Sequence, residues 1–128
     1  MRSAPLVLLV DDDEDIRMVV RDVLESEGYA VELASDGATA LSRLQRPPPP
    51  SLILLDMTMP FMDGVTVVRE LEARESLSCV PILLLTALLP SVVSTLALPT
   101  SYAILHKPFD LDVFLRTVAA RTAIETVA

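Results

Sequence analysis

The sequence predicts an α/β fold, a doubly wound five-stranded parallel sheet with helices on both of its faces. Short apolar runs alternate five times with segments whose apolar residues recur at helical spacing, which is the βα pattern of a parallel sheet. Most of these runs are continuously apolar, as expected for strands buried on both faces. A length of 128 residues with 52% hydrophobic residues suits one core, so residues 1–128 are interpreted as a single domain.

The N-terminal half is expected to supply three strands and two helices. The first helix should end at Gly28, because glycine is the usual residue just after a helix. The second should end before the prolines at 47–50, for which a stiff extended connector is expected. The predicted elements are strand 6–10, helix 13–27, strand 30–34, a helix that opens at Asp36-Gly37 and carries Ala40, Leu41 and Leu44, and strand 52–55.

The C-terminal half is expected to complete the alternation. A turn at 59–64 precedes a helix that carries Val65, Val68 and Leu71. The short helix predicted at 90–98 begins with proline, whose missing N–H is not needed at a helix start. The remaining elements are strand 81–85, strand 102–105 and a last helix from 110 or 111 to about 122. Nothing after that helix resembles a DNA-binding or enzymatic output segment.

A stretch without formal charge, residues 76–105, has the length of a membrane-spanning helix. Pro81, Pro90 and Pro99 divide it into short pieces, and a lipid-exposed helix would have to satisfy its backbone again at each proline. The N-terminus shows no charged-then-apolar signal pattern. We therefore expect strand, short helix and strand here, with no membrane span and no export.

Net charge limits the kinds of ligand that the chain is expected to bind, and cysteine content bears on its cellular location. A formal net charge of -8 without a basic stripe argues against direct binding of nucleic acid. A metal cation or a basic partner surface suits this charge better. Cys79 is the single cysteine, which excludes an internal disulfide and favours a reducing, cytoplasmic location.

Polar residues follow the ends of four predicted strands. Asp11 and Asp12 follow the first strand, Asp56 the third and Thr86 the fourth, and Lys107 comes shortly after the fifth. Because parallel strands end at one edge of a sheet, these side chains are expected to meet there. Three converging carboxylates repel one another unless a cation joins them, and hard oxygen ligands favour Mg²⁺ or Mn²⁺.

Lys107 is the only lysine among ten basic residues, the others being arginines. Lysine carries a compact point charge, which suits contact with one oxygen of a small phosphoryl group better than the planar fork of arginine. A chance surface lysine is less expected between a buried strand and Pro108. His106, in contrast, is expected to be a solvent-facing loop residue rather than a metal ligand.

Four sequence blocks together resemble the response-regulator receiver domain. They are Val10-Asp11-Asp12, the segment 55–64 with Asp56, Thr58 and Asp63-Gly64, then Leu85-Thr86-Ala87, and finally Lys107-Pro108-Phe109. Their order and spacing match over essentially the whole chain. The resemblance implies a flavodoxin-like sheet of strand order 2-1-3-4-5 and a role as phosphoacceptor in a two-component signalling system.

The resemblance also implies an acceptor and a set of metal ligands. Asp56 would accept a phosphoryl group from a histidine kinase, a histidine phosphotransfer protein or a small acyl phosphate. Mg²⁺ (or Mn²⁺) would be bound by Asp12, Asp56 and the main-chain carbonyl of Thr58. Asp11 would help to bind the metal through water.

Further roles are implied for the residues after the fourth and fifth strands. Lys107 would contact the phosphoryl oxygens, Thr86 would hydrogen-bond one of them, and Ala87 would leave space for the group. The bond between Lys107 and Pro108 would be cis, as is usual in this family. Such a domain assists its own phosphorylation and dephosphorylation but is not otherwise an enzyme.

Ile104 departs from the pattern, because the family usually has an aromatic residue three positions before the lysine. The predicted fourth helix and fifth strand are also apolar where family members commonly carry charge. We expect these changes to alter the route from phosphorylation to output and to leave the chemistry intact. An exposed apolar surface on this helix and strand predicts a homodimer or the docking of a partner.

Three alternatives use some of the same residues. A haloacid-dehalogenase-like phosphohydrolase also has an aspartyl nucleophile, but it needs a second aspartate where Thr58 stands. A calcium loop with ligands at Asp11, Asp13 and Asp15 lacks its turn glycine, because Ile16 stands there. The main alternative is a pseudo-receiver, an interaction module with weak or no phosphorylation. The intact acidic, threonine and lysine set argues against it.

Overall fold

The computed structural model describes residues 4–56, 64–74, 80–86 and 103–122. Within them, helices and strands follow the predicted order, whereas the helix predicted at 90–98 lies outside the described residues. In chain order the elements are β1 (Leu6–Val10), α1 (Glu14–Ser26), β2 (Ala30–Ala34), α2 (Gly37–Leu44), β3 (Leu52–Asp56), α3 (Gly64–Glu72), β4 (Ile82–Thr86), β5 (Ala103–His106) and α5 (Leu111–Thr122).

The strands form one parallel sheet in the order β2-β1-β3-β4-β5, which confirms the predicted topology. Leu9 of β1 pairs with Leu33 on one side and Leu54 on the other. Further out, Leu84 of β4 pairs with Ile104 of β5. The strand β2 thus lies on one side of β1, and β3 and the later strands lie on the other. The strand order reverses between β1 and β3, and ligands in such sheets bind where the order reverses.

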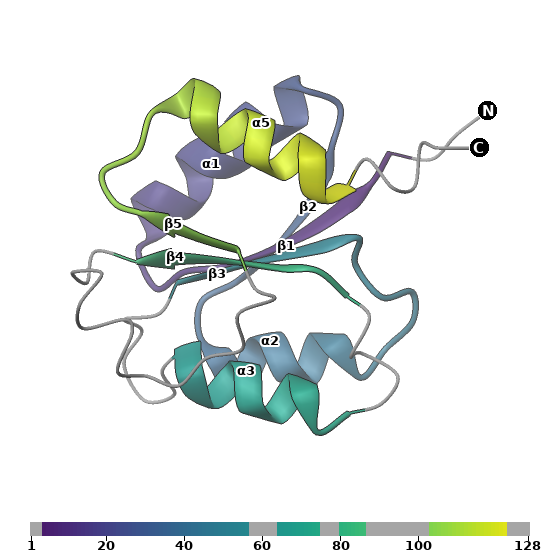
Figure 1. The fold of residues 1–128 in the computed structure, drawn as a ribbon. Helices are drawn as coiled ribbons and strands as arrows, with labels where there is room; N and C mark the ends of the chain where they lie inside the picture. Colours follow the sequence, from purple (N-terminus) through teal and green to yellow (C-terminus); the bar gives the residue numbers. More distant parts are fainter. Residues whose placement is uncertain (1–3, 57–63, 75–79, 87–102, 123–128) are drawn as a thin grey trace.

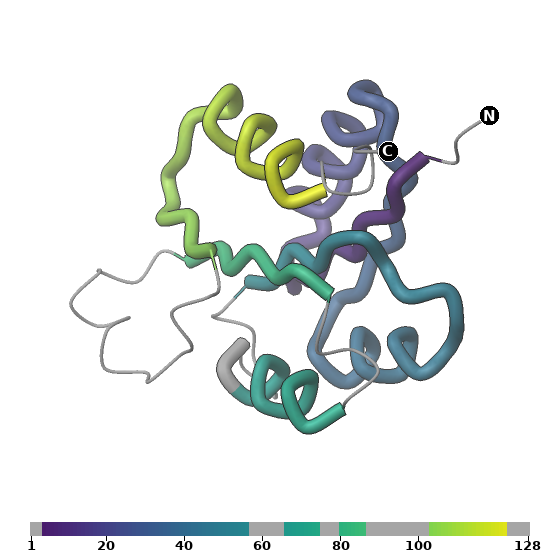
Figure 2. Tube along the Cα trace, turned by 45° about the vertical axis from the view of Figure 1, so that its right-hand side comes forward, coloured from purple at the N-terminus to yellow at the C-terminus, as the bar shows by residue number. Residues whose placement is uncertain are grey.

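Helices cover both faces of the sheet, with α1 and α5 on one face and α2 and α3 on the other (Figures 1 and 2). Because side chains alternate along a strand, each strand contributes to two cores. Every residue of β3 and β4 is buried, which confirms the prediction from their continuous apolar runs. The core beneath α1 and α5 contains Val7, Leu9, Leu24, Leu52, Leu54, Leu83, Leu85, Phe114 and Val118, and the other contains Leu8, Val10, Ala40, Leu41, Leu44, Ile53, Leu55, Val67, Val68, Leu71 and Leu84.

Two aspartates cap the helices that follow β1 and β2. The side chain of Asp13 accepts a hydrogen bond from the N–H of Ile16 at 3.1 Å, which satisfies a backbone donor in the first turn of α1. Asp36 accepts from the N–H of Thr39 at 2.7 Å, and this bond lowers the pKa of the Asp36 carboxyl. Gly28, with φ of 95°, follows the end of α1 as predicted.

Three strands run one residue further than the sequence predicts. Asp56 ends β3 opposite Leu85, and Thr86 ends β4 opposite His106 at the end of β5. The expectation that His106 lies in a solvent-facing loop is therefore wrong, because the residue is half-buried in β5. The reason is that the parallel ladder continues past the apolar run as long as a neighbouring strand offers backbone partners.

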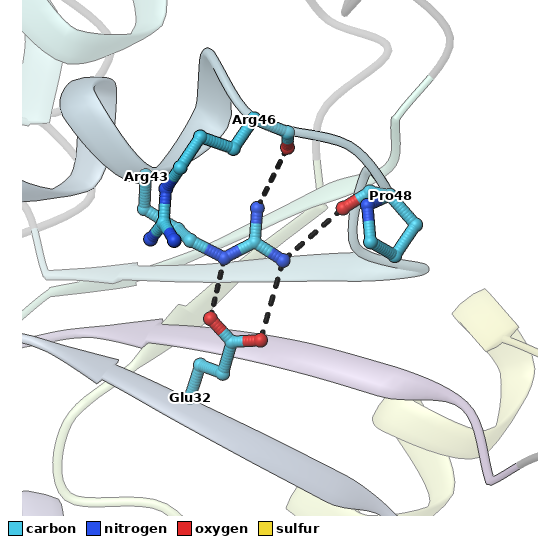
Figure 3. A network of polar contacts seen from close by, with 4 residues as sticks. All are labelled: Glu32, Arg43, Arg46 and Pro48. Atoms are coloured by element: carbon cyan, nitrogen blue, oxygen red, sulfur yellow. Dashed lines mark hydrogen bonds and ion pairs between the residues drawn. The ribbon is translucent and has the colours of Figure 1, made fainter.

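Arg43 at the end of α2 holds the proline connector against the sheet (Figure 3). Its guanidinium donates to the carboxylate of Glu32 on β2 and to the carbonyls of Arg46, at 2.9 Å, and Pro48, at 3.1 Å. The pair with Arg43 lowers the pKa of Glu32. The prediction of a stiff extended connector is wrong for its first half, because the chain bends at 46–48. The bond between Pro47 and Pro48 is cis.

The described parts of the charge-free stretch at 76–105 include β4 and the first residues of β5. Both are strands of the sheet, as predicted. Among the residues that the structure describes, no helix combines the length and the apolar character needed to cross a membrane.

Candidate metal centre

One edge of the sheet, where the parallel strands end, collects the predicted site residues; we call it the carboxyl edge. Asp11 and Asp12 directly follow β1, Asp56 is the last residue of β3 and Thr86 the last of β4. Lys107 follows β5, and its N–H donates to the carbonyl of Thr86 at 2.6 Å. The topology therefore brings together residues that are far apart in the sequence, as predicted.

The carboxylates of Asp11, Asp12 and Asp56 form an acidic cluster. Each offers an oxygen, and these oxygens lie within 4.8 Å of one another. Asp11 and Asp56 are buried, with 1% and 3% of their surface exposed, whereas Asp12 is exposed. The cluster thus reaches the surface through Asp12, and its other two carboxylates lie buried beneath. Carboxylate oxygens open to water on one side suit Mg²⁺, which keeps several of its water ligands.

Asp11 is the most constrained member of the acidic cluster. Its Oδ1 accepts a hydrogen bond from the N–H of Asp13 at 3.0 Å. Its Oδ2 is buried and makes no hydrogen bond within the described part of the chain. Burial raises the pKa of the Asp11 carboxyl, as does the charge of Asp56, against the opposing influence of the Asp13 N–H and of Lys107. A buried carboxylate oxygen of this kind can accept a hydrogen bond from water or contact a cation.

Lys107 brings positive charge to the acidic cluster. Its Nζ lies 3.7 Å from Asp11 Oδ2 and 3.9 Å from Asp56 Oδ1. One ammonium against three carboxylates leaves two negative charges, which a divalent cation would balance. The bond between Lys107 and Pro108 is cis, as the resemblance implied.

Phe109 anchors the loop that carries Lys107. Its ring stacks on that of Phe114 in α5, with centroids 5.3 Å apart, and Phe114 is buried in the core. The lysine is therefore held between the end of β5 and a residue fixed to the core. This arrangement limits how far the ammonium can move from the carboxylates.

Four other residues singled out in the sequence have different outcomes. Thr86 is fully buried at the carboxyl edge, and its contact with a phosphoryl group stays a prediction. Thr58, predicted to offer a carbonyl to the metal, lies outside the described residues, as does Ala87. Ile104 is half-buried and packs against the core on the α2 and α3 side of the sheet.

Arg17 belongs to this region and was missed by the reasoning from sequence. Its Nη1 donates to the main-chain carbonyl of Asp11 at 2.7 Å. Helical side chains lean toward the N-terminus of their helix, so a long side chain in the first turn can reach the loop before it. That geometry is the signal that could have identified Arg17.

The arrangement as a whole suits attack by a carboxylate on an electrophile that carries negative oxygens. Asp56 and Asp11 are both buried carboxylates close to the lysine, at 3.9 and 3.7 Å, and each lies beside two other potential metal ligands. A metal ion and an ammonium beside such a carboxylate would neutralise the charge of the reacting group.

This chain matches the sequence model of a known protein family and resembles curated proteins. The sequence model described as "Response regulator receiver domain" matches residues 7–119. Response regulator MprA of Mycobacterium leprae (strain TN) is 41% identical over 116 residues, which cover 89% of this chain and 49% of MprA. The chain spans about half or less of the length of the first curated relatives that it matches.

Solved structures agree with these matches. The receiver domain of a signal transduction histidine kinase from Syntrophus aciditrophicus superposes with a TM-score of 0.84 at 29% identity, covering 98% of this chain and 95% of that one. The receiver domain of the sensor histidine kinase PA1611 from Pseudomonas aeruginosa PAO1 gives a TM-score of 0.81 at 31% identity, covering 94% and 98%. That structure has a magnesium ion coordinated in its active site cleft.

Proposed function

Because the chain belongs to the response regulator receiver domain family, we propose that Asp56 accepts a phosphoryl group in a Mg²⁺-dependent reaction of a two-component system. One observation carries the proposal. The buried carboxylate of Asp56 lies among the oxygens of Asp11 and Asp12 and 3.9 Å from the ammonium of Lys107. The candidate nucleophile, the candidate metal ligands and a neutralising ammonium thus lie close together, which supports the proposal.

The transfer forms a bond between a carboxylate oxygen of Asp56 and phosphorus. The bond from phosphorus to the donor breaks, and its electron pair stays with the leaving atom, an imidazole nitrogen of phosphohistidine or the carboxyl oxygen of an acyl phosphate. Since a carboxylate is a weak nucleophile, neutralising the phosphoryl oxygens provides most of the acceleration. Lys107 would contact one of these oxygens, and Thr86 would donate its hydroxyl to another after transfer.

The acidic cluster fits a divalent cation in charge and in donor type. Asp12 and Asp56, with the carbonyl of Thr58, would hold Mg²⁺ directly, and Mn²⁺ offers the same charge and a similar ligand preference. The buried Oδ2 of Asp11 would accept a hydrogen bond from a metal-bound water. A bound Mg²⁺ would supply positive charge to the phosphoryl oxygens. The chain would assist its own phosphorylation and dephosphorylation and catalyse no other reaction.

The test of this function is phosphorylation of the wild-type chain by acetyl phosphate, followed by intact mass. We expect a phosphoryl adduct with Mg²⁺ and loss of almost all labelling when EDTA removes the metal. Equal labelling in EDTA would contradict the metal dependence. The absence of an adduct at any Mg²⁺ concentration would favour the pseudo-receiver instead.

The natural donor would be a histidine kinase or a histidine phosphotransfer protein, and helix α1 offers a surface for it. This helix begins at the carboxyl edge (Figure 1) and exposes three apolar side chains, Ile16, Met18 and Val19, the last with 62% of its surface exposed. Ile16, Val19 and Val20 also line a shallow apolar depression. A phosphohistidine on a protein surface can reach Asp56 only if that surface lies against the carboxyl edge, so α1 would contact it.

Val19→Glu is expected to slow phosphotransfer from a phosphorylated histidine protein by about tenfold, because it places a charge in an apolar contact. Transfer from acetyl phosphate, which needs no such contact, should be unchanged. The control is Ala119→Glu, on an exposed position of α5 toward its C-terminal end. If Val19→Glu slows both donors equally, or neither, α1 is not the docking surface.

The surface that would respond to phosphorylation includes the predicted helix 90–98, which lies outside the described residues. A homodimer or partner contact through this helix and β5 therefore stays a prediction. The cytoplasmic location and the lack of direct nucleic acid binding stay predictions as well.

A further inference from the structure

The turn between β1 and α1 carries two of the three carboxylates of the acidic cluster, and hydrogen bonds fix its main chain. The N–H of Asp11 donates to the carbonyl of Ala34 at 3.1 Å. The N–H of Asp13 donates to Asp11 Oδ1 at 3.0 Å, and that of Ile16 to Asp13 Oδ1 at 3.1 Å. In a further bond the donor is a side chain: Arg17 Nη1 donates to the main-chain carbonyl of Asp11 at 2.7 Å.

The bond from Arg17 acts on the peptide group that joins Asp11 to Asp12. This group is planar, so rotation of its carbonyl would also rotate the N–H of Asp12 and redirect the side chains on either side. The other three bonds hold Asp11 and Asp13, and none of them touches the peptide plane before Asp12. Among the hydrogen bonds of this turn within the described residues, the bond from Arg17 is thus the one that restrains this peptide plane, and it helps to set the direction in which Asp12 leaves the main chain.

We propose that Arg17 is a positioning residue for the metal site. Its guanidinium holds the peptide between Asp11 and Asp12 so that both carboxylates converge with that of Asp56. The inference rests on the proposed Mg²⁺-dependent function and deepens it. Arginine suits the task because its charge is permanent and its hydrogen bonds to oxygen are short and directional.

A positioning role and a simple charge effect predict opposite results when Arg17 is replaced. A cation beside a metal site repels the metal ion, so removal of the charge alone should tighten Mg²⁺ binding. Loss of a hydrogen bond that orients the ligands should weaken binding instead, by about tenfold. The direction of the change in affinity therefore distinguishes the two.

The experiment measures the Kd for Mg²⁺ in wild type, Arg17→Met, Arg17→Lys and Arg21→Met. Because the chain has no tryptophan, binding is followed by amide shifts in ¹H–¹⁵N NMR spectra, which also report whether each variant is folded. Arg21 is the matched control, since it lies one turn further along α1 and pairs with Asp22 at 3.3 Å and Glu25 at 3.8 Å. Its replacement removes the same charge from the same helix without touching the turn.

We expect Arg17→Met to raise the Kd about tenfold and Arg21→Met to change it less than about twofold. Arg17→Lys keeps the charge and one donor, so its Kd should lie between those of wild type and Arg17→Met. The Mg²⁺ concentration for half-maximal phosphorylation should rise with the Kd, whereas the maximal rate should change far less.

Three outcomes would overturn the inference, and they differ in whether they also affect the proposed metal site. A Kd for Arg17→Met equal to or lower than that of Arg21→Met would refute the positioning role alone. The positioning role is equally refuted if Arg17→Met does not fold and the folded Arg17→Lys binds Mg²⁺ no more weakly than wild type. The absence of any Mg²⁺-dependent shift in wild type would remove the metal site, and this inference with it.

Discussion

Asp56→Asn is expected to lower the rate of phosphorylation by acetyl phosphate by at least about a thousandfold, because the amide cannot act as the nucleophile. Asparagine has nearly the same shape as aspartate, and the change removes a buried negative charge from a cluster of three. The fold should therefore survive, and the loss of activity would be chemical. Intact mass against time, at saturating Mg²⁺, measures the rate.

The control for this variant is Asp15→Asn. Asp15 is an exposed carboxylate in the first turn of α1, outside the acidic cluster, so its loss changes the net charge equally and leaves the acceptor in place. We expect its rate to stay within about twofold of wild type. Labelling of Asp56→Asn at the wild-type rate would place the acceptor elsewhere.

Asp11→Asn is expected to weaken Mg²⁺ binding about 10- to 100-fold and yet to stabilise the metal-free chain. Burial and the neighbouring carboxylates raise the pKa of Asp11, so its charged form is less favourable in the folded than in the unfolded chain. This cost is fully present above the raised pKa and disappears as the pH falls below the ordinary value of 3.8. A neutral amide removes the cost and can still accept from the N–H of Asp13.

Thermal unfolding measures both effects of Asp11→Asn. In EDTA at pH 7 we expect the Tm to rise by roughly 3–5 °C, which corresponds to about 1 kcal/mol for a chain of this size. A ligand stabilises the folded state more when its concentration is higher relative to its Kd. At one high Mg²⁺ concentration the Tm of wild type should therefore rise more than that of the variant, which binds Mg²⁺ more weakly. A lower Tm in EDTA would mean that the ion pair with Lys107, at 3.7 Å, outweighs burial and repulsion.

Much of the fold and the candidate site follows from patterns within single segments. The apolar runs at β1, β3 and β4 are continuous because these strands are buried on both faces, and this identifies them in the sequence. Asp11, Asp12 and Asp56 lie at strand ends, so the parallel topology alone brings them together. The same holds for Lys107, which follows β5 directly.

Other features depend on how far side chains reach across the folded chain. The contact from Arg17 to the Asp11 carbonyl and the contacts from Arg43 to Glu32 and Pro48 join different elements, and no local periodicity reports them. The bend at 46–48 lies where Arg43 contacts the carbonyls of Arg46 and Pro48, whereas proline content alone predicts an extended chain. The last residue of a strand is similarly decided by the neighbouring strand, which is how His106 came to lie in β5.

The central claim, that Asp56 carries the phosphoryl group, is tested most directly by locating the modification. The wild-type chain is phosphorylated with acetyl phosphate and Mg²⁺, the acyl phosphate is trapped by reduction with borohydride, and the modified residue is identified by peptide mass spectrometry. We predict a single reduced residue at position 56 and none in a sample prepared with EDTA. A reduced residue at Asp11 or Asp12, with Asp56 unchanged, would contradict the claim.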